Sequence, residues 1–119
     1  MAMGRIIKFY REDGKCPVTE FLDTLPSKTA QKVLWVLKLI EQLERVPSQF
    51  FKKLEDTDEI WEVRADYGRD AIRLLGFWSD GSFIVLTNGF QKKSKKTPTT
   101  EISLAENRRR KYRGRGNHE

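Results

Sequence analysis

The spacing of apolar residues in the first half of the chain predicts one strand followed by two helices. An apolar run at residues 5–10 is typical of a short strand, and the Glu-Asp-Gly sequence after it predicts a turn. Residues 17–25 begin with a proline, which fits the first turn of a helix. Residues 28–45 carry apolar side chains three and four positions apart, which is typical of an amphipathic helix, and Ser27 is its candidate N-cap.

The second half of the chain shows the two-residue alternation of β-strands. Over residues 59–65 this alternation predicts two faces, with Ile60, Glu62 and Arg64 on one and Trp61, Val63 and Ala65 on the other. Two more apolar runs, residues 71–78 and 83–90, flank a Ser-Asp-Gly-Ser turn. Because short turns join the three segments, they predict an antiparallel meander.

A third helix is predicted over residues 98–111, because Thr97 and Pro98 suit an N-cap and a first helical position. The predicted order is β-α-α-β-β-β-α, an α+β fold with helices packed on an antiparallel sheet. A chain of 119 residues, 38% of them hydrophobic, is expected to form one domain, over residues 1–112. The basic residues 113–119 are expected to be a disordered tail.

Composition excludes several kinds of chemistry. Cys16 is the only cysteine, which excludes an internal disulfide and a multi-thiolate metal site. His118 is the only histidine and lies two residues from the end of the sequence, which argues strongly against a Ser-His-Asp triad. We therefore expect no metal and no cofactor. The first ten residues lack the apolar stretch of a signal peptide, and no apolar run is long enough to span a membrane. We expect a cytoplasmic protein without a membrane partner.

The net charge of +6 is concentrated in the last quarter of the chain. Residues 91–119 carry 10 basic and 3 acidic residues, whereas residues 1–90 carry 13 basic and 14 acidic ones. A segment of this kind attracts polyanions such as RNA, DNA or an acidic protein surface.

Four short motifs, spread over roughly residues 6–110, resemble those of the RelE/ParE superfamily of bacterial toxins, and within it the HigB-like, phage-associated branch. They are Phe51-Lys52-Lys53-Leu54, Ile60-Trp61-Glu62-Val63-Arg64, Ile72-Arg73-Leu74-Leu75-Gly76-Phe77, and Leu86-Thr87-Asn88-Gly89-Phe90-Gln91-Lys92-Lys93 before Thr97-Pro98. No single motif is diagnostic, but their order along the chain is fairly specific.

The resemblance implies a toxin of a type II toxin–antitoxin pair. RelE- and HigB-like members are ribosome-dependent mRNA endonucleases, whereas the ParE branch inhibits DNA gyrase. A third hypothesis is an inactive homologue that only binds nucleic acid or protein. The implied partners are the ribosome and mRNA, together with a HigA-like helix-turn-helix antitoxin that binds operator DNA. That antitoxin would cover the basic cleft or block access to the ribosomal A site.

The implied chemistry is attack of a ribose 2′-OH on the adjacent phosphodiester, without a metal. Arginine suits the charged transition state because its guanidinium stays charged and donates in pairs. Lysine suits proton donation to the leaving oxygen where neighbouring cations lower its pKa. Glu62 is either a general base or the ion-pair partner of an arginine. The implied catalytic residues are Glu62, Arg64, Arg73, Lys92 and Lys93.

A second set of basic and aromatic residues is predicted to bind RNA: Lys52, Lys53, Tyr67, Phe90, Lys95, Lys96, Arg108, Arg109 and Arg110. Simpler readings stand beside these roles. Arg64 and Arg73 could pair with carboxylates for structural reasons, and the lysines of residues 92–96 could be an ordinary solvated loop. Many HigB-like enzymes use a histidine near the active site; here only His118 is present, so the chemistry would rest on lysine, arginine and glutamate.

Overall fold

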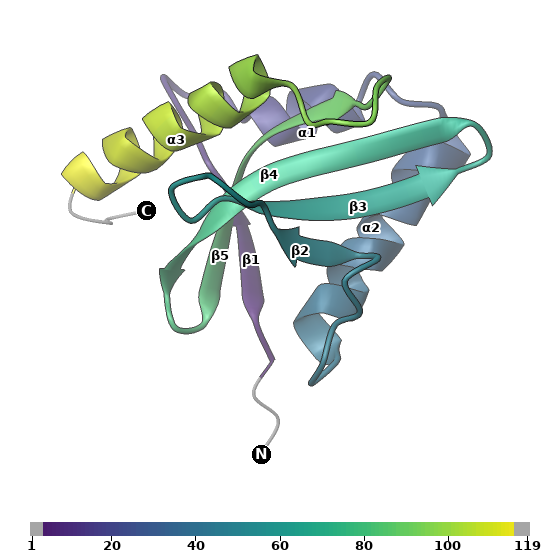
Figure 1. Cartoon of the computed structure of the whole chain (residues 1–119), viewed down its shortest axis with the longest axis horizontal. Helices are drawn as coiled ribbons and strands as arrows, with labels where there is room; N and C mark the ends of the chain where they lie inside the picture. The colour runs from purple at the N-terminus through teal and green to yellow at the C-terminus, as the bar shows by residue number, and fades with distance from the viewer. Residues whose placement is uncertain (1–3, 116–119) are drawn as a thin grey trace.

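The computed structural model describes residues 4–115, which form one five-stranded sheet with helices on both faces (Figure 1). The elements in chain order are β1 (Ile6–Phe9), α1 (Pro17–Leu22), α2 (Ser27–Gln42), β2 (Phe51–Lys53), β3 (Trp61–Tyr67), β4 (Asp70–Asp80), β5 (Phe83–Gln91) and α3 (Thr99–Gly114). The strands lie in the order β1-β5-β4-β3-β2. The α+β fold predicted from the sequence is confirmed.

The antiparallel meander of β3, β4 and β5 is confirmed, but the sheet is not antiparallel throughout. β1 pairs with β5 in the parallel direction, with Ile6 opposite Phe83. More than seventy residues separate these two strands in the sequence, so no short turn forces them to run in opposite directions. Gly76 lies where the β4–β5 register shifts, and a Cβ there would come within 2.2 Å of the Val85 carbonyl oxygen. The close approach of the two backbones therefore requires glycine at this position.

β2 was not predicted, and it adds a fourth consecutive strand. It pairs antiparallel with β3, so that Lys52 lies opposite Glu62 and Phe51 opposite Val63. A strand of three residues is too short to show alternation in the sequence. Its first side chain, Phe51, stacks on Trp61 with ring centroids 4.8 Å apart, and this contact fixes β2 against the apolar face of β3.

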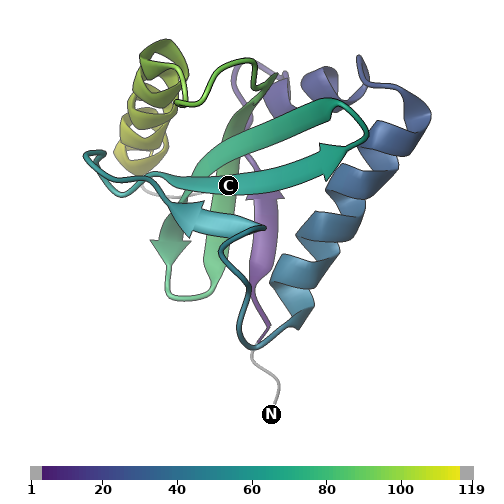
Figure 2. The same ribbon diagram turned by 45° about the vertical axis from the view of Figure 1, so that its right-hand side comes forward.

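The main core lies between the sheet and helices α1 and α2, and Figure 2 shows the sheet between these helices and α3. Fully buried aliphatic side chains from α2 and the central strands fill it, among them Val33, Val36, Ile40, Leu74 and Ile84. The opposite face is covered by α3 over only part of its area. Two smaller clusters, centred on Tyr112 and Ala105, join α3 to the sheet. The rest of that face is left for polar side chains.

The ends of the helices differ from the prediction by one to three residues. α1 ends at Leu22 rather than residue 25, since the Thr24 hydroxyl and amide both donate to the Phe21 carbonyl and form a turn. α2 ends at Gln42 rather than residue 45 and has Pro26, not Ser27, at its N-cap position. Pro98 rather than Thr97 occupies the N-cap of α3.

α3 extends beyond its predicted end at residue 111. It includes Arg113 and Gly114, both of which were assigned to a disordered tail, and Arg115 donates to the Tyr10 hydroxyl at 3.0 Å. The tail prediction is therefore wrong for these residues. The remainder of the predicted tail, residues 116–119 with His118, lies outside the described residues.

Candidate functional site

The β3–β4 register brings two arginines side by side on the face that α3 leaves uncovered. Arg64 of β3 and Arg73 of β4 are direct Cα partners in the antiparallel ladder. Glu62 lies two residues before Arg64 and therefore on the same face, as the alternation predicted. Like charges placed directly opposite one another in a sheet destabilise it, so this arrangement needs a compensating charge.

Glu62 supplies that charge from a buried position, with 2% of its surface exposed. Its Oε1 lies 3.6 Å from Arg64 Nε and 4.0 Å from Arg73 Nε. Its Oε2 accepts a hydrogen bond of 2.6 Å from the Thr97 hydroxyl. One carboxylate thus connects both arginines with the loop that leads from β5 to α3.

Arg73 has a second acidic partner and is the more tightly held of the two arginines. Its Nη1 donates to Asp66 Oδ1 at 2.7 Å and to the Ile72 carbonyl at 2.9 Å. Its side chain is 6% exposed, whereas that of Arg64 is 31% exposed. Arg64 is therefore the guanidinium with more room to contact a ligand.

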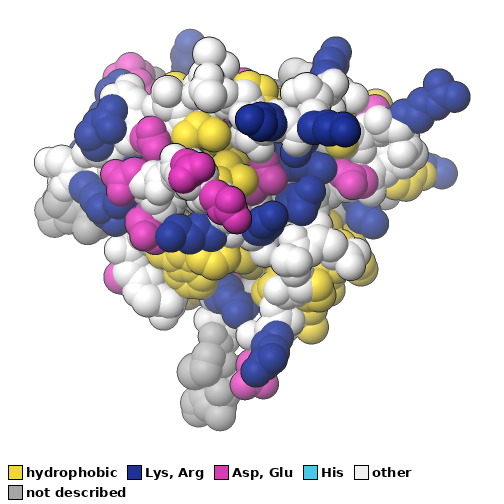
Figure 3. Space-filling view, in the orientation of Figure 1, with side chains coloured by type: hydrophobic (Ala, Val, Ile, Leu, Met, Phe, Trp, Pro, Cys, Tyr) yellow, Lys and Arg dark blue, Asp and Glu magenta, His cyan; other side chains and the backbone are white. Residues whose placement is uncertain are grey.

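An open groove of about 520 Å³, here called the main groove, lies in front of this cluster. Its basic lining residues are Lys52, Arg64, Lys92, Lys95 and Lys96. Acidic, polar and apolar residues complete the lining, among them Leu54, Glu55, Asp56, Glu62, Thr97 and Ile102. Figure 3 shows this face of the molecule, where basic and acidic side chains gather next to one another with apolar atoms exposed between them.

A second groove of about 400 Å³, here called the side groove, adjoins the main one. It is lined by Ala71, Arg73, Lys92, Lys93, Ser94 and Lys95, so Lys92 and Lys95 border both grooves. The structure therefore brings Glu62, Arg64, Arg73, Lys92 and Lys93 together, although β3, β4 and the loop after β5 supply them separately. A polyanion could contact both grooves at once.

Two neighbouring lysines of β2 are separated by strand alternation. Lys52 lies opposite Glu62 and lines the main groove. Lys53 lies opposite Trp61 and pairs with Glu59 at 3.4 Å, so it does not join the groove lining.

The two aromatic candidates for base stacking differ in exposure. Tyr67 is 43% exposed at the end of β3, where a base could reach its ring. Phe90 is 8% exposed and packs in the cluster of Ile60, Leu75 and Ala105. Its buried ring offers a base little surface, so the structure does not support a stacking role for Phe90.

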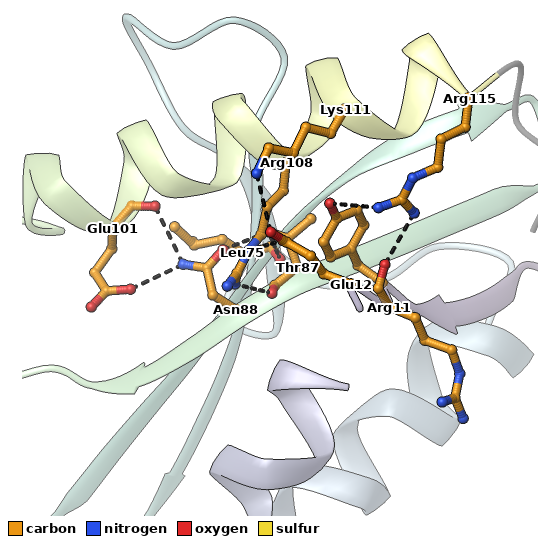
Figure 4. Close-up of polar contacts among 10 residues, drawn as sticks. Arg11, Glu12, Leu75, Thr87, Asn88, Glu101, Arg108, Lys111 and Arg115 are labelled. Atoms are coloured by element: carbon orange, nitrogen blue, oxygen red, sulfur yellow. Dashed lines mark hydrogen bonds and ion pairs between the residues drawn. The ribbon is translucent and has the colours of Figure 1, made fainter. Parts of the chain in front are cut away.

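Two arginines of α3 hold the helix on the body of the protein. Arg109 is buried and pairs with Asp58 at 2.6 Å. Arg108 donates to the Thr87 carbonyl at 2.8 Å and lies 3.5 Å from Glu12 (Figure 4). Both guanidiniums therefore have structural partners instead of facing the main groove. Arg110 is exposed and outside both groove linings, so its predicted RNA contact stays a prediction.

Further polar contacts attach both ends of α3. Asn88 donates to the carboxylate of Glu101 at 2.9 Å at the beginning of the helix (Figure 4). Near its end, Lys111 donates to Glu12 at 3.1 Å, and this hydrogen bond holds the pKa of the Glu12 carboxyl below its usual value. Burial raises the pKa of the neighbouring Tyr10 hydroxyl.

Sequence reasoning missed Thr97 and Asp66 as members of the site. Thr97 was assigned to a helix cap, and its hydroxyl binds Glu62 instead. The strand predicted over residues 59–65 stops short of Asp66, but β3 continues through Tyr67 and places the Asp66 carboxylate beside Arg73. Within residues 4–115, no group of three or more metal-binding side chains is present, and no helix is both long and apolar enough to cross a membrane.

The fold and the site define a small α+β protein with a basic groove on the uncovered part of its sheet, where arginines and lysines could contact a phosphate. The chain belongs to the phage-derived protein Gp49-like family (DUF891), whose family model matches residues 20–110. This family is part of the RelE/ParE-like toxin superfamily, as the sequence motifs indicated, and its members are usually paired with an antitoxin. A search of curated proteins finds no significant match.

Proposed function

We propose that this protein is a HigB-like toxin that cleaves mRNA on the ribosome. The observation that carries the proposal is the main groove, in which Arg64 and three lysines of one loop stand around a buried carboxylate. Membership of the Gp49-like family supports a toxin of the RelE type. A groove with this concentration of positive charge favours a phosphodiester backbone over a neutral ligand.

The proposed reaction is an internal transfer of the phosphoryl group. The ribose 2′-oxygen bonds to phosphorus, the bond from phosphorus to the 5′-oxygen breaks, and the products are a 2′,3′-cyclic phosphate and a free 5′-hydroxyl. Arg64 stabilises the negative charge that builds up on the phosphoryl oxygens. Lys92, at the junction of the two grooves, gives its proton to the departing 5′-oxygen, and the proton of the 2′-OH passes to water.

In this reaction Glu62 orients the arginines and does not act as the base. Glu62 lines the main groove, but only 2% of its surface is exposed and both of its oxygens already face protein donors, so no free carboxylate oxygen is left to take a proton. Arg73, held by Asp66, keeps Glu62 in place and contributes positive charge to the side groove. An antitoxin that covered the main groove would block this site.

The experiment that tests the proposal is brief expression of the chain alone in bacteria, with mapping of mRNA 5′ ends. We expect new ends within translated codons for the wild-type chain and their loss in Arg64→Ala. Arg45→Ala is the matched control, because Arg45 is exposed near the end of α2 and the variant loses the same charge outside the grooves. Growth arrest without new ends would contradict the proposal and favour inhibition of gyrase.

A further inference from the structure

The main groove has an acidic side that the proposed cleavage reaction does not explain. Glu55 and Asp56, from the connection between β2 and β3, line the same groove as the lysines of the β5–α3 loop. The next two carboxylates of this connection form ion pairs within the protein: Asp58 pairs with Arg109, and Glu59 pairs with Lys53. Among residues 4–115, neither Glu55 nor Asp56 forms an ion pair or a side-chain hydrogen bond.

An apolar surface completes the groove. Leu54 and Ile102 line it and belong to the cluster that packs α3 on the sheet. Apolar side chains of this kind can pack against the face of a nucleobase. The volume of about 520 Å³ lies within the range of small-molecule sites and leaves room for a nucleotide.

The carboxylates and the loop lysines of the groove come from different connections of the fold, β2–β3 and β5–α3, and this gives a bound nucleotide a direction. Its phosphate is attracted to Lys95 and Lys96 and repelled by the carboxylates of Glu55 and Asp56. The base is then left beside those carboxylates, which can only accept hydrogen bonds. Cytosine, adenine and guanine offer an exocyclic amino group to such acceptors, whereas uracil offers a carbonyl oxygen at the same position as the amino group of cytosine.

We propose that the main groove selects a nucleotide with an amino-bearing base, which donates to Glu55 and Asp56 while its phosphate binds the lysines. The inference deepens the proposed function and rests on it for its biological meaning, because it assigns a base preference to the RNA that is cut. Glu55 and Asp56 are then specificity-determining residues that read the edge of a base.

The test measures the binding of free nucleotides to the purified 119-residue chain by NMR titration. Two pairs of probes differ at the relevant group: CMP against UMP, and GMP against inosine monophosphate, which lacks the amino group of guanine. For the wild-type chain we expect the amino-bearing member of each pair to bind about three- to tenfold more tightly, since hydrogen bonds to solvent-accessible carboxylates provide the lower part of the usual discrimination.

The double variant Glu55→Gln, Asp56→Asn should remove this preference. It also makes the groove more positive and strengthens the binding of every monophosphate, so the ratio of affinities within a pair is the readout. Glu59→Gln is the control, because it removes a charge from the same connection outside the groove lining and should keep the preference.

Equal affinities within both pairs for the wild-type chain would overturn the inference, and so would an unchanged preference in the double variant or no nucleotide binding. These outcomes are distinct from failure of the proposed function. A chain that shows the nucleotide preference but produces no new mRNA ends would contradict cleavage and leave the base-reading groove intact.

Discussion

At the scale of single residues, the carboxylate of Glu62 offsets the repulsion between two arginines that the strand register places opposite one another. A buried charge is costly when it loses its partners, because water cannot replace them. Glu62 has partners on both oxygens, and Arg73 has a further one in Asp66. The cluster therefore depends on its central acid more than on any one of its cations.

We expect Glu62→Gln to lower the free energy of unfolding by about 3 kcal/mol, because it leaves Arg64 and Arg73 without their shared counter-charge. Thr97→Val removes one hydrogen bond to the same carboxylate and should cost about 1 kcal/mol. Urea denaturation of the two variants beside the wild-type chain gives both values. If Glu62→Gln proved as stable as the wild-type chain, the carboxylate would not be holding the arginines.

The candidate site could be predicted from the sequence only in part, and the reason is visible in individual residues. Strand alternation was enough to place Glu62 and Arg64 on one face. Local sequence could not show that the hydroxyl of Thr97 crosses to Glu62, since that contact depends on the path of a loop. It also could not distinguish Lys95, which lines the grooves, from Arg109, which is buried against Asp58.

At the scale of elements, α3 is attached to the sheet by polar side chains as well as by apolar ones. Its buried residues are Ala105, Arg109 and Tyr112, and one of the three is charged. This explains why the basic residues of the helix looked like a free surface in the sequence. β2 was missed for a related reason, because pairing with β3, rather than any pattern of its own three residues, makes it a strand.

The contact between Glu12 and α3 makes the stability of the protein depend on pH. The pKa of Glu12 is lowered in the folded chain, chiefly by the hydrogen bond from Lys111, so its contribution to stability is present above the ordinary pKa of 4.5. The contribution is lost as the pH falls through the lowered value. We expect Glu12→Gln to be less stable than the wild-type chain near neutral pH, and the difference to shrink in acid.

Urea denaturation of both chains between about pH 7 and about pH 3 measures this difference. Glu44→Gln is the control, because Glu44 is exposed after α2 and no ion pair of its side chain is present in the described residues. If the difference in the free energy of unfolding between Glu12→Gln and the wild-type chain stayed constant over the whole pH range, ionisation of Glu12 would not be holding α3.

At the scale of the whole molecule, basic residues from the last quarter of the chain have two different roles in the fold. The lysines of the β5–α3 loop line the grooves, whereas Arg108 and Arg109 of α3 pair with acidic residues of the body of the protein. The net charge of the chain therefore overstates the charge that a polyanion meets. What decides binding is the number of phosphates that the groove lysines neutralise.

The salt dependence of RNA binding measures that number. Each phosphate contact on a single strand contributes about 0.7 to the slope of log affinity against log salt concentration. We expect Lys95→Ala with Lys96→Ala to reduce the slope by about 1.4 for a short single-stranded RNA, because both residues line the main groove. Lys28→Ala with Lys38→Ala removes the same charge from exposed positions on α2 and should leave the slope unchanged. Equal slopes for the two double variants would mean that RNA responds to the overall charge of the protein and not to the grooves.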